Sequence, residues 1–147
     1  MSTIDPGMES LMEAFIYETT TLLEQLDEIM LESEKEKNIS EDSINEIFRI
    51  MHTIKGSAAM MGFAGISNLA HAIEDVFFLI REDPSRLSAI IEAIFDLVFQ
   101  SSDFLKQEIE NVQSDDYQPR DPSDLINQLE AQPAIMKGEA PPAASGT

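Results

Sequence analysis

Apolar residues recur at steps of three and four along most of the chain, the spacing that places them on one face of an α-helix. The first such stretch runs from Met8 to about Ser33 and predicts one long amphipathic helix. Its apolar positions are Met8, Leu11, Met12, Phe15, Leu22, Leu23, Leu26, Ile29 and Met30. A charged stretch without an apolar face follows, and Ser40 then offers a side-chain oxygen that can cap a second helix.

The same spacing predicts three further long helices. The second has the core positions Ile44, Ile47, Phe48, Met51, Ile54 and Ala58. Gly62 and Gly65 bracket a short connection to a third helix, which ends near Pro84. The third helix has the core positions Ile66, Leu69, Ala70, Ile73, Phe77 and Ile80. Pro84 suits the first turn of a fourth helix, which extends to about Gln113.

A short fifth helix completes the expected architecture. Asp121 and Pro122 form a helix start, with the proline at the first helical position, and Leu125, Ile126 and Leu129 give the helix an apolar face. We expect it to end by Gln132, because Pro133 follows. The sequence therefore predicts an all-α fold, an antiparallel four-helix bundle with a short fifth C-terminal helix. Residues 1–131 form this domain, and residues 132–147 form a flexible, linker-like tail rich in Ala and Pro.

Composition narrows the classes of partner. The chain has 28 acidic and 9 basic residues and a formal net charge of −19, which argues against binding to nucleic acid or an anionic membrane. It has no cysteine, so neither disulfides nor thiolate metal sites are expected. No segment approaches the roughly 20 apolar residues of a membrane span, and no signal peptide is visible. We expect a cytoplasmic protein without membrane insertion.

Candidate chemistry concentrates around one histidine of the second helix. Arg49, His52, Lys55, Gly56 and Ala59 follow steps of three and four on a face away from the core positions. His52 therefore points outward, between two of the few basic residues of an acidic chain, where an anion can bind. A glycine within a helix costs roughly 1 kcal/mol relative to alanine. Gly56 is thus explained by the close approach of another molecule, or else by helix packing or chance.

The third helix brings a carboxylate to this histidine. His52 and Glu74 are equally far, eleven positions each, from residue 63 at the centre of the expected turn. Because both helices rise about 1.5 Å per residue, the two residues lie level with each other in an antiparallel hairpin. A carboxylate that binds one ring nitrogen fixes the tautomer and leaves the other nitrogen as a nucleophile. His71, one turn before Glu74, lies on the same side of its helix.

These residues resemble a known family. The pattern His52-x-x-Lys55-Gly56-Ser57, then Gly62-Phe63, then His71-x-x-Glu74 is similar to that of the histidine-phosphotransfer (HPt) domains at the N-terminus of CheA-type chemotaxis histidine kinases. The helical order matches over about residues 8–131. The resemblance implies a four-helix bundle with a fifth helix. It also implies that His52 accepts a phosphoryl group from ATP through the kinase catalytic domain and passes it to an aspartate of a response regulator receiver domain.

The resemblance also implies roles for the other residues. His52 would be the phosphoacceptor, Glu74 would orient its ring, Lys55 would stabilise the phosphoryl group, and His71 would belong to the supporting polar network. Partner docking would involve Gly56, Arg49 and Ala59. The chain itself would bind no cofactor, since ATP and Mg²⁺ belong to the partner kinase domain. It contains no nucleotide-binding motif, so by itself it is expected to be a substrate and carrier of an ATP-dependent histidine kinase, not an enzyme.

Three other interpretations remain open from the sequence. A free-standing phosphorelay HPt shuttle has a similar motif and bundle, although the fifth helix and linker-like tail favour a kinase domain. A metal protein could use His52, His71 and Glu74 as ligands, but such bundles use several inward carboxylates that these apolar faces lack. A helical adaptor without chemistry is the third.

Overall fold

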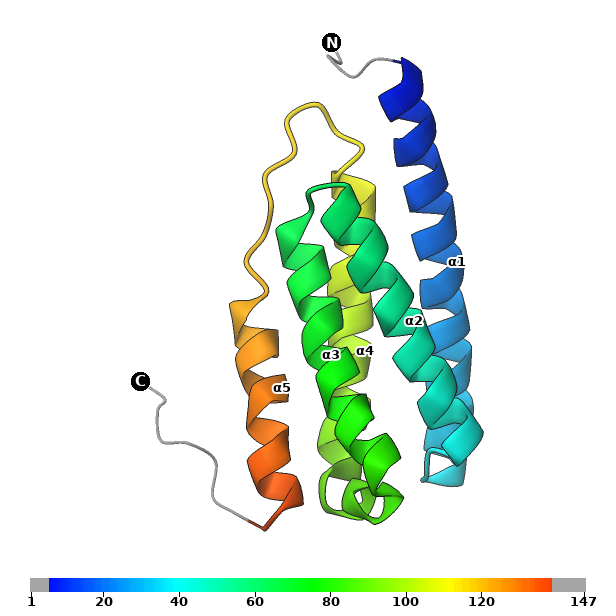
Figure 1. Cartoon of the computed structure of the whole chain (residues 1–147), viewed down its shortest axis with the longest axis vertical. Helices are drawn as coiled ribbons and strands as arrows, with labels where there is room; N and C mark the ends of the chain where they lie inside the picture. Colours follow the sequence, from blue (N-terminus) through cyan, green and yellow to red (C-terminus); the bar gives the residue numbers. More distant parts are fainter. Residues whose placement is uncertain (1–5, 139–147) are drawn as a thin grey trace.

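The structure is a computed structural model that describes residues 6–138, and within this range it contains helices and no strand. The long helices are α1 (Pro6–Glu36), α2 (Glu41–Met60), α3 (Ala64–Glu82) and α4 (Leu87–Asn111), followed by α5 (Ser123–Met136). A 3-10 turn, Pro84–Arg86, precedes α4. Helices α1 to α4 run alternately down and up as an antiparallel bundle (Figure 1), which confirms the predicted fold class.

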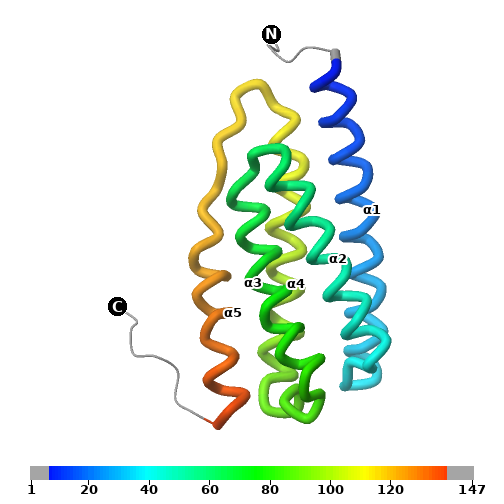
Figure 2. Tube along the Cα trace, in the orientation of Figure 1, coloured from blue at the N-terminus to red at the C-terminus, as the bar shows by residue number. Residues whose placement is uncertain are grey.

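The helices pack in an order that leaves one side of α2 open. Helix α2 packs against α3 in a hairpin and against α1 on its other flank, while α1 also contacts α4. After α4, the chain crosses the upper end of the bundle and returns as α5, which lies against α3 and α4 (Figure 2). Helix α5 therefore covers the side of α3 away from α2, and it does not cover α2.

Two local signals determine where α2 begins and ends. The Ser40 hydroxyl accepts the backbone N–H of Ser43 at 3.1 Å, which confirms the predicted cap. At the other end, Gly62 adopts a φ of +82°, a left-handed conformation that glycine reaches without the strain that a Cβ adds. The short turn at Gly62 and Phe63 brings α3 back directly alongside α2. The level pairing of the two helices follows from this turn.

The core differs from the predicted apolar faces at several positions. Ile50 is fully buried, whereas Phe48, which the spacing assigned to the core, is only half-buried. Met8 and Leu11 are exposed, because the first turns of α1 extend past the other helices (Figure 1). The other predicted core positions of α2 and α3 are buried: Ile44, Ile47, Met51, Ile54, Ala58, Ile66, Leu69, Ala70, Ile73, Phe77 and Ile80.

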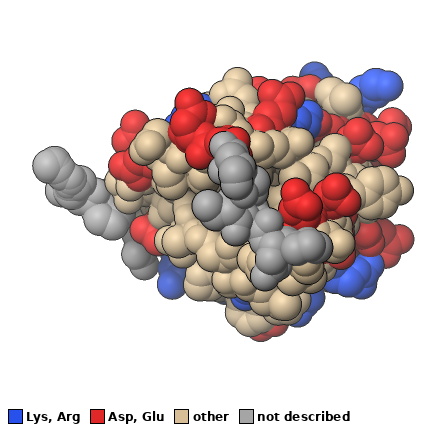
Figure 3. All heavy atoms as spheres, turned by 90° about the horizontal axis from the view of Figure 1, so that it is seen from above, with Lys and Arg blue, Asp and Glu red and all other residues tan. Residues whose placement is uncertain are grey.

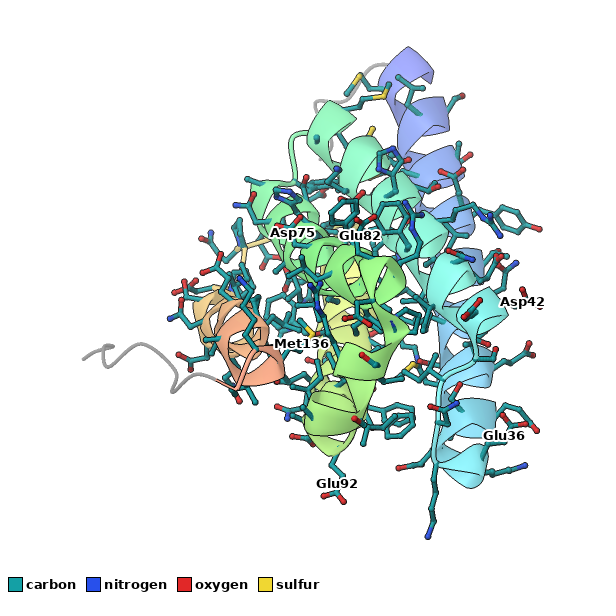
Figure 4. The ribbon with its side chains drawn as sticks, turned by 60° about the horizontal axis from the view of Figure 1, so that its bottom comes forward. Glu36, Asp42, Asp75, Glu82, Glu92 and Met136 are labelled. Atoms are coloured by element: carbon teal, nitrogen blue, oxygen red, sulfur yellow. The ribbon has the colours of Figure 1, made fainter. Side chains whose placement is uncertain are left out.

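Helix α5 is longer than the sequence analysis predicts. The expectation that it stops by Gln132 is wrong, since the helix includes Pro133 and ends at Met136 (Figure 4). A proline inside a helix costs roughly 3 kcal/mol. Here Ile135 and Met136 pack on the core, and their burial offsets that cost. The division into a bundle of residues 1–131 and a tail stays a prediction, because most of the tail, residues 139–147, lies outside the described residues.

A buried carboxylate anchors the connection between α4 and α5. Glu108 of α4 accepts hydrogen bonds from the Tyr117 hydroxyl at 2.7 Å and from Arg120 Nε at 2.8 Å. Burial by itself raises the pKa of the Glu108 carboxyl, but the bonds from Arg120 and Tyr117 outweigh it and lower the pKa. Burial and the same carboxylate raise the pKa of Tyr117 to about 12. The Tyr117 ring also meets Phe63 edge to face, so the connection is held against the α2–α3 turn.

The acidic composition is visible on the surface. Viewed from above the bundle, the acidic side chains form several patches, while the basic side chains lie mainly toward the margin (Figure 3). Among residues 6–138, none of the helices combines the length and apolar character needed to cross a membrane.

Candidate functional site

The site is centred on His52, on the open side of α2. Its side chain is 64% exposed, although neighbouring residues of the same helix are in the core. The Nδ1 atom lies 2.6 Å from Oε2 of Glu74. The structure thus brings together the two residues that the hairpin geometry placed level with each other. Because an ionised carboxylate can only accept hydrogen bonds, Nδ1 carries the hydrogen, and Nε2 of the neutral ring keeps its lone pair.

Glu74 is the buried member of the site. Its side chain is only 7% exposed, and its two oxygens have separate partners. Oε2 accepts from His52, and Oε1 lies 2.7 Å from Nζ of Lys55. Burial by itself raises the pKa of the Glu74 carboxyl, but the hydrogen bonds from Lys55 and His52 outweigh burial, and the pKa lies below the ordinary 4.5. Glu74 is therefore a carboxylate at neutral pH. It can keep the hydrogen of the neutral His52 ring on Nδ1, and it can stabilise a positive charge on that ring.

Lys55 has a contact that the sequence did not reveal. Level pairing places it opposite His71, yet its long side chain reaches Glu74, and only 30% of it is exposed. Its backbone carbonyl accepts a hydrogen bond from the Ser67 hydroxyl of α3 at 2.9 Å, which ties this turn of α2 to α3. His52, Glu74 and Lys55 therefore form one connected group. Lys55 both neutralises Glu74 and carries a positive charge one turn from the imidazole.

The remaining predicted site residues lie on the exposed surface. Arg49 forms an ion pair with Glu46 at 2.7 Å, one turn earlier on α2. His71 pairs with Asp75 at 3.4 Å, and both side chains are largely exposed. Among the described residues no hydrogen bond or ion pair joins His71 to Glu74. Gly56 and Ala59 are exposed. A Cβ built on Gly56 meets no atom within 4 Å, so helix packing does not explain this glycine.

An aromatic ring of α2 also flanks the histidine. Phe48 lies one turn before His52, with the two rings 6.3 Å apart between centroids and inclined by only 9°. The site thus restrains the imidazole in two ways, by the hydrogen bond from Nδ1 and by the neighbouring ring. The sequence analysis assigned Phe48 to the core and missed this contact. Its position four residues before His52 on the same helix was the available signal.

We expect the Lys55–Glu74 ion pair to support the fold. Lys55→Ala leaves the buried Glu74 carboxylate with one partner fewer, so the pKa of Glu74 should rise and the free energy of unfolding at neutral pH should fall by about 1–3 kcal/mol. Urea denaturation and an NMR titration of the Glu74 carboxyl carbon measure the two effects.

The matched control for Lys55→Ala is Arg49→Ala, which removes another cation one turn from His52. Its ion pair with Glu46 lies on the surface, so the expected loss of stability is within about 0.5 kcal/mol. Equal losses of unfolding free energy in the two variants would show that the Lys55–Glu74 pair contributes no more to stability than a surface ion pair.

The described part of the chain offers no set of ligands for a metal ion. Among residues 6–138, no group of three or more His, Asp or Glu side chains is arranged to hold a metal ion. His52 and Glu74 instead use each other, and the second oxygen of Glu74 is taken by Lys55.

Comparison with known proteins shows similarity to Hpt domains and to CheA proteins. The family model of the Hpt domain matches residues 10–115. The chain is 33% identical over 144 residues to the chemotaxis protein CheA of Treponema pallidum, a match that covers 97% of this chain and 17% of the relative. It is 32% identical over 122 residues to CheA of Listeria monocytogenes, covering 83% of this chain and 19% of the relative.

A third relative is the sensor histidine kinase CheAY of Helicobacter pylori, 33% identical over 99 residues, with 67% of this chain and 12% of the relative covered. The chain thus spans less than a fifth of the length of each of these three proteins. No solved structure matches the chain significantly.

Proposed function

Because the chain belongs to the Hpt domain family, we propose that it is the phosphotransfer domain of a chemotaxis histidine kinase and that His52 carries the phosphoryl group. The observation that supports this role most directly is the 2.6 Å contact between His52 Nδ1 and Glu74. It assigns the hydrogen to Nδ1 and leaves the lone pair on Nε2 of a side chain that is 64% exposed. Among the described residues, no hydrogen bond uses Nε2.

The proposed reaction has two balanced steps. In the first, the Nε2 lone pair attacks the γ-phosphorus of ATP, the N–P bond forms, and the bond to the bridging oxygen breaks as ADP leaves. The ring then carries a positive charge, which the Glu74 carboxylate at Nδ1 stabilises. In the second step, a carboxylate oxygen of the receiver aspartate attacks phosphorus, an acyl phosphate forms, and the electrons of the N–P bond return to Nε2.

The chain's contribution is to orient the nucleophile and balance charge. Phosphoryl transfer depends mainly on positioning and on electrostatic stabilisation of the transferred oxygens. Lys55 is one turn from His52 and is held by Glu74, so its ammonium is placed to attract those oxygens while it remains paired. ATP and Mg²⁺ are bound by the kinase catalytic domain in this proposal, and the chain is their substrate. His71 pairs with the exposed Asp75 and is given no part in the transfer.

A kinase domain is favoured over a free-standing phosphorelay shuttle. The relatives named as CheA extend far beyond the matched region, and the match to the Treponema pallidum protein includes 97% of this chain. The cytoplasmic location and the response regulator partner remain part of the proposal.

The direct test combines this chain with the catalytic domain of the parent kinase and ATP labelled at the γ-phosphate. We expect an acid-labile label on the chain, as a phosphorus–nitrogen bond requires, and its loss when a receiver domain is added. A chain that stays unlabelled under conditions where the kinase is active would contradict the proposal. An acid-stable label would contradict it as well.

Gly56→Ala separates fold from function. Because the site around Gly56 is open, alanine fits and should raise the free energy of unfolding by up to about 1 kcal/mol, the difference in helix propensity. If Gly56 gives an incoming active site room to reach His52, the same variant should be phosphorylated more slowly. Ala59→Gly, the reverse change one turn further along the exposed side of α2, is the control and should lower stability. A Gly56→Ala variant with unchanged phosphorylation kinetics would show that this glycine serves no partner.

A further inference from the structure

Arg81, in the last turn of α3, is held by aromatic rings and not by a counter-ion. Its guanidinium carbon lies 4.3 Å from the centroid of the Phe48 ring and 5.9 Å from that of Phe78. Among residues 6–138, no hydrogen bond or ion pair engages it. A guanidinium over an aromatic face keeps its N–H donors free at its edge. Arg81 is thus a positioned cation whose hydrogen-bonding capacity is unused.

The cluster of Arg81, Phe48 and Phe78 adjoins the phosphoacceptor. Phe48 is in contact with Phe78, at 6.4 Å between centroids, and lies parallel to the His52 ring. Phe78 is 42% exposed, which is unusual for a phenylalanine in a bundle with a large core. Aromatic residues and arginine are the side chains most enriched at the energetic centres of protein interfaces. A partner that reaches Nε2 of His52 therefore meets this cluster at the edge of the same surface.

The charges around this cluster indicate which kind of partner surface can bind to it. With a net charge of −19, most of this chain repels an acidic partner. Arg49 and Lys55, the cations one turn from His52 on α2, are paired with Glu46 and Glu74. Arg81 lies on the Phe48 ring next to His52 and has no acidic partner among the described residues, so it is the cation best able to bind a carboxylate of an approaching protein.

We propose that Arg81, supported by Phe48 and Phe78, is a specificity residue that docks the receiver domain of the response regulator. This inference rests on the proposed function. The receiver presents an acceptor aspartate, and proteins usually hold the Mg²⁺ of phosphoryl transfer through one or two carboxylates beside the phosphate, so we expect the surface around that aspartate to be acidic. The kinase catalytic domain belongs to the same protein in this proposal and benefits from a high effective concentration. The receiver arrives by diffusion, and electrostatic steering and docking matter more for it.

The experiment measures transfer from the phosphorylated chain to the receiver domain as a function of receiver concentration. Arg81→Gln keeps the stem of the side chain and removes its charge. We expect it to raise KM about tenfold, the change that corresponds to about 1.4 kcal/mol, while kcat stays nearly constant, because Arg81 does not touch the reacting atoms. Because salt screens the attraction of Arg81, the difference in KM between wild type and variant should shrink as the salt concentration rises. Phe78→Ala should raise KM in the same direction.

Lys137→Gln is the matched control, since it removes one exposed positive charge just past the end of α5, which packs against α3 on the side away from α2. Its KM should be unchanged. An Arg81→Gln variant with wild-type KM would overturn the inference. So would a variant whose phosphorylation by the kinase domain slows while transfer to the receiver does not. If the wild-type chain were never labelled, the proposed function itself would fail, which is a distinguishable result.

Discussion

Substitution of His52 by glutamine should abolish phosphorylation of the chain and leave its fold intact. The reacting nitrogen is lost, and no other described side chain combines a free nitrogen nucleophile with a buried orienting carboxylate. The side chain is 64% exposed and contributes little to the core, so the free energy of unfolding should change by no more than about 0.5–1 kcal/mol. Glutamine is preferred to alanine because its amide N–H can still donate to Glu74, which keeps the buried carboxylate paired.

The chain provides its own control for this experiment. It has two histidines, and the other, His71, pairs with Asp75 on the surface of α3. His71→Gln should therefore remain phosphorylated at nearly the wild-type rate. Labelling by the kinase domain with labelled ATP, followed by peptide mapping, measures both variants. Acid-labile label on His52→Gln, or its loss from His71→Gln alone, would reassign the phosphoacceptor.

Substitution of Glu74 by glutamine should slow phosphorylation by about 10²-fold, the usual contribution of an acid–base or orienting partner. The amide has one acceptor oxygen in place of two, so it cannot accept from both His52 and Lys55 as the carboxylate does. It also lacks the negative charge that stabilises the ring when Nε2 becomes bonded to phosphorus. The imidazole should therefore populate both tautomers, and part of the chains would have the hydrogen on the attacking nitrogen.

Nitrogen-15 NMR of the His52 ring separates this orienting role from a purely structural one. In the wild-type chain we expect the hydrogen on Nδ1, and in Glu74→Gln a mixture of tautomers. Asp75→Asn is the control, because this neighbouring carboxylate is exposed and contacts His71, not His52. A wild-type rate together with an unchanged tautomer in Glu74→Gln would show that His52 works without this carboxylate.

Glu74 also makes stability depend on pH in a defined direction. Its pKa in the folded chain lies below the ordinary 4.5, because the bonds from Lys55 and His52 outweigh burial. Its contribution to stability is therefore fully present above about pH 4.5, the ordinary value, and is lost as the pH falls through the lower pKa of the folded chain. Glu108 behaves in the same way. Denaturation curves should show wild type losing its advantage over Glu74→Gln only in this acidic range.

The fold and the central pair of the site could be predicted because they depend on short-range regularities. Helical spacing of apolar residues placed the helices, Ser40 and Gly62 determined the ends of α2, and a short turn forced α2 and α3 to lie level. The approach of Glu74 to His52 follows from that turn and the helical rise, without knowledge of the rest of the molecule. The motif around these residues then indicated the family that the comparisons show.

Other features were decided only by tertiary structure. The pairing of Lys55 with Glu74, the packing of Arg81 on Phe48 and the anchoring of the α4–α5 connection by Glu108 depend on where long side chains end, and sequence spacing does not determine that. The continuation of α5 through Pro133 was likewise hidden, because a local rule predicted a stop. The packing of Ile135 and Met136 against the core outweighs the cost of a proline within the helix. This packing depends on how the helices are arranged in space, which local sequence rules do not include.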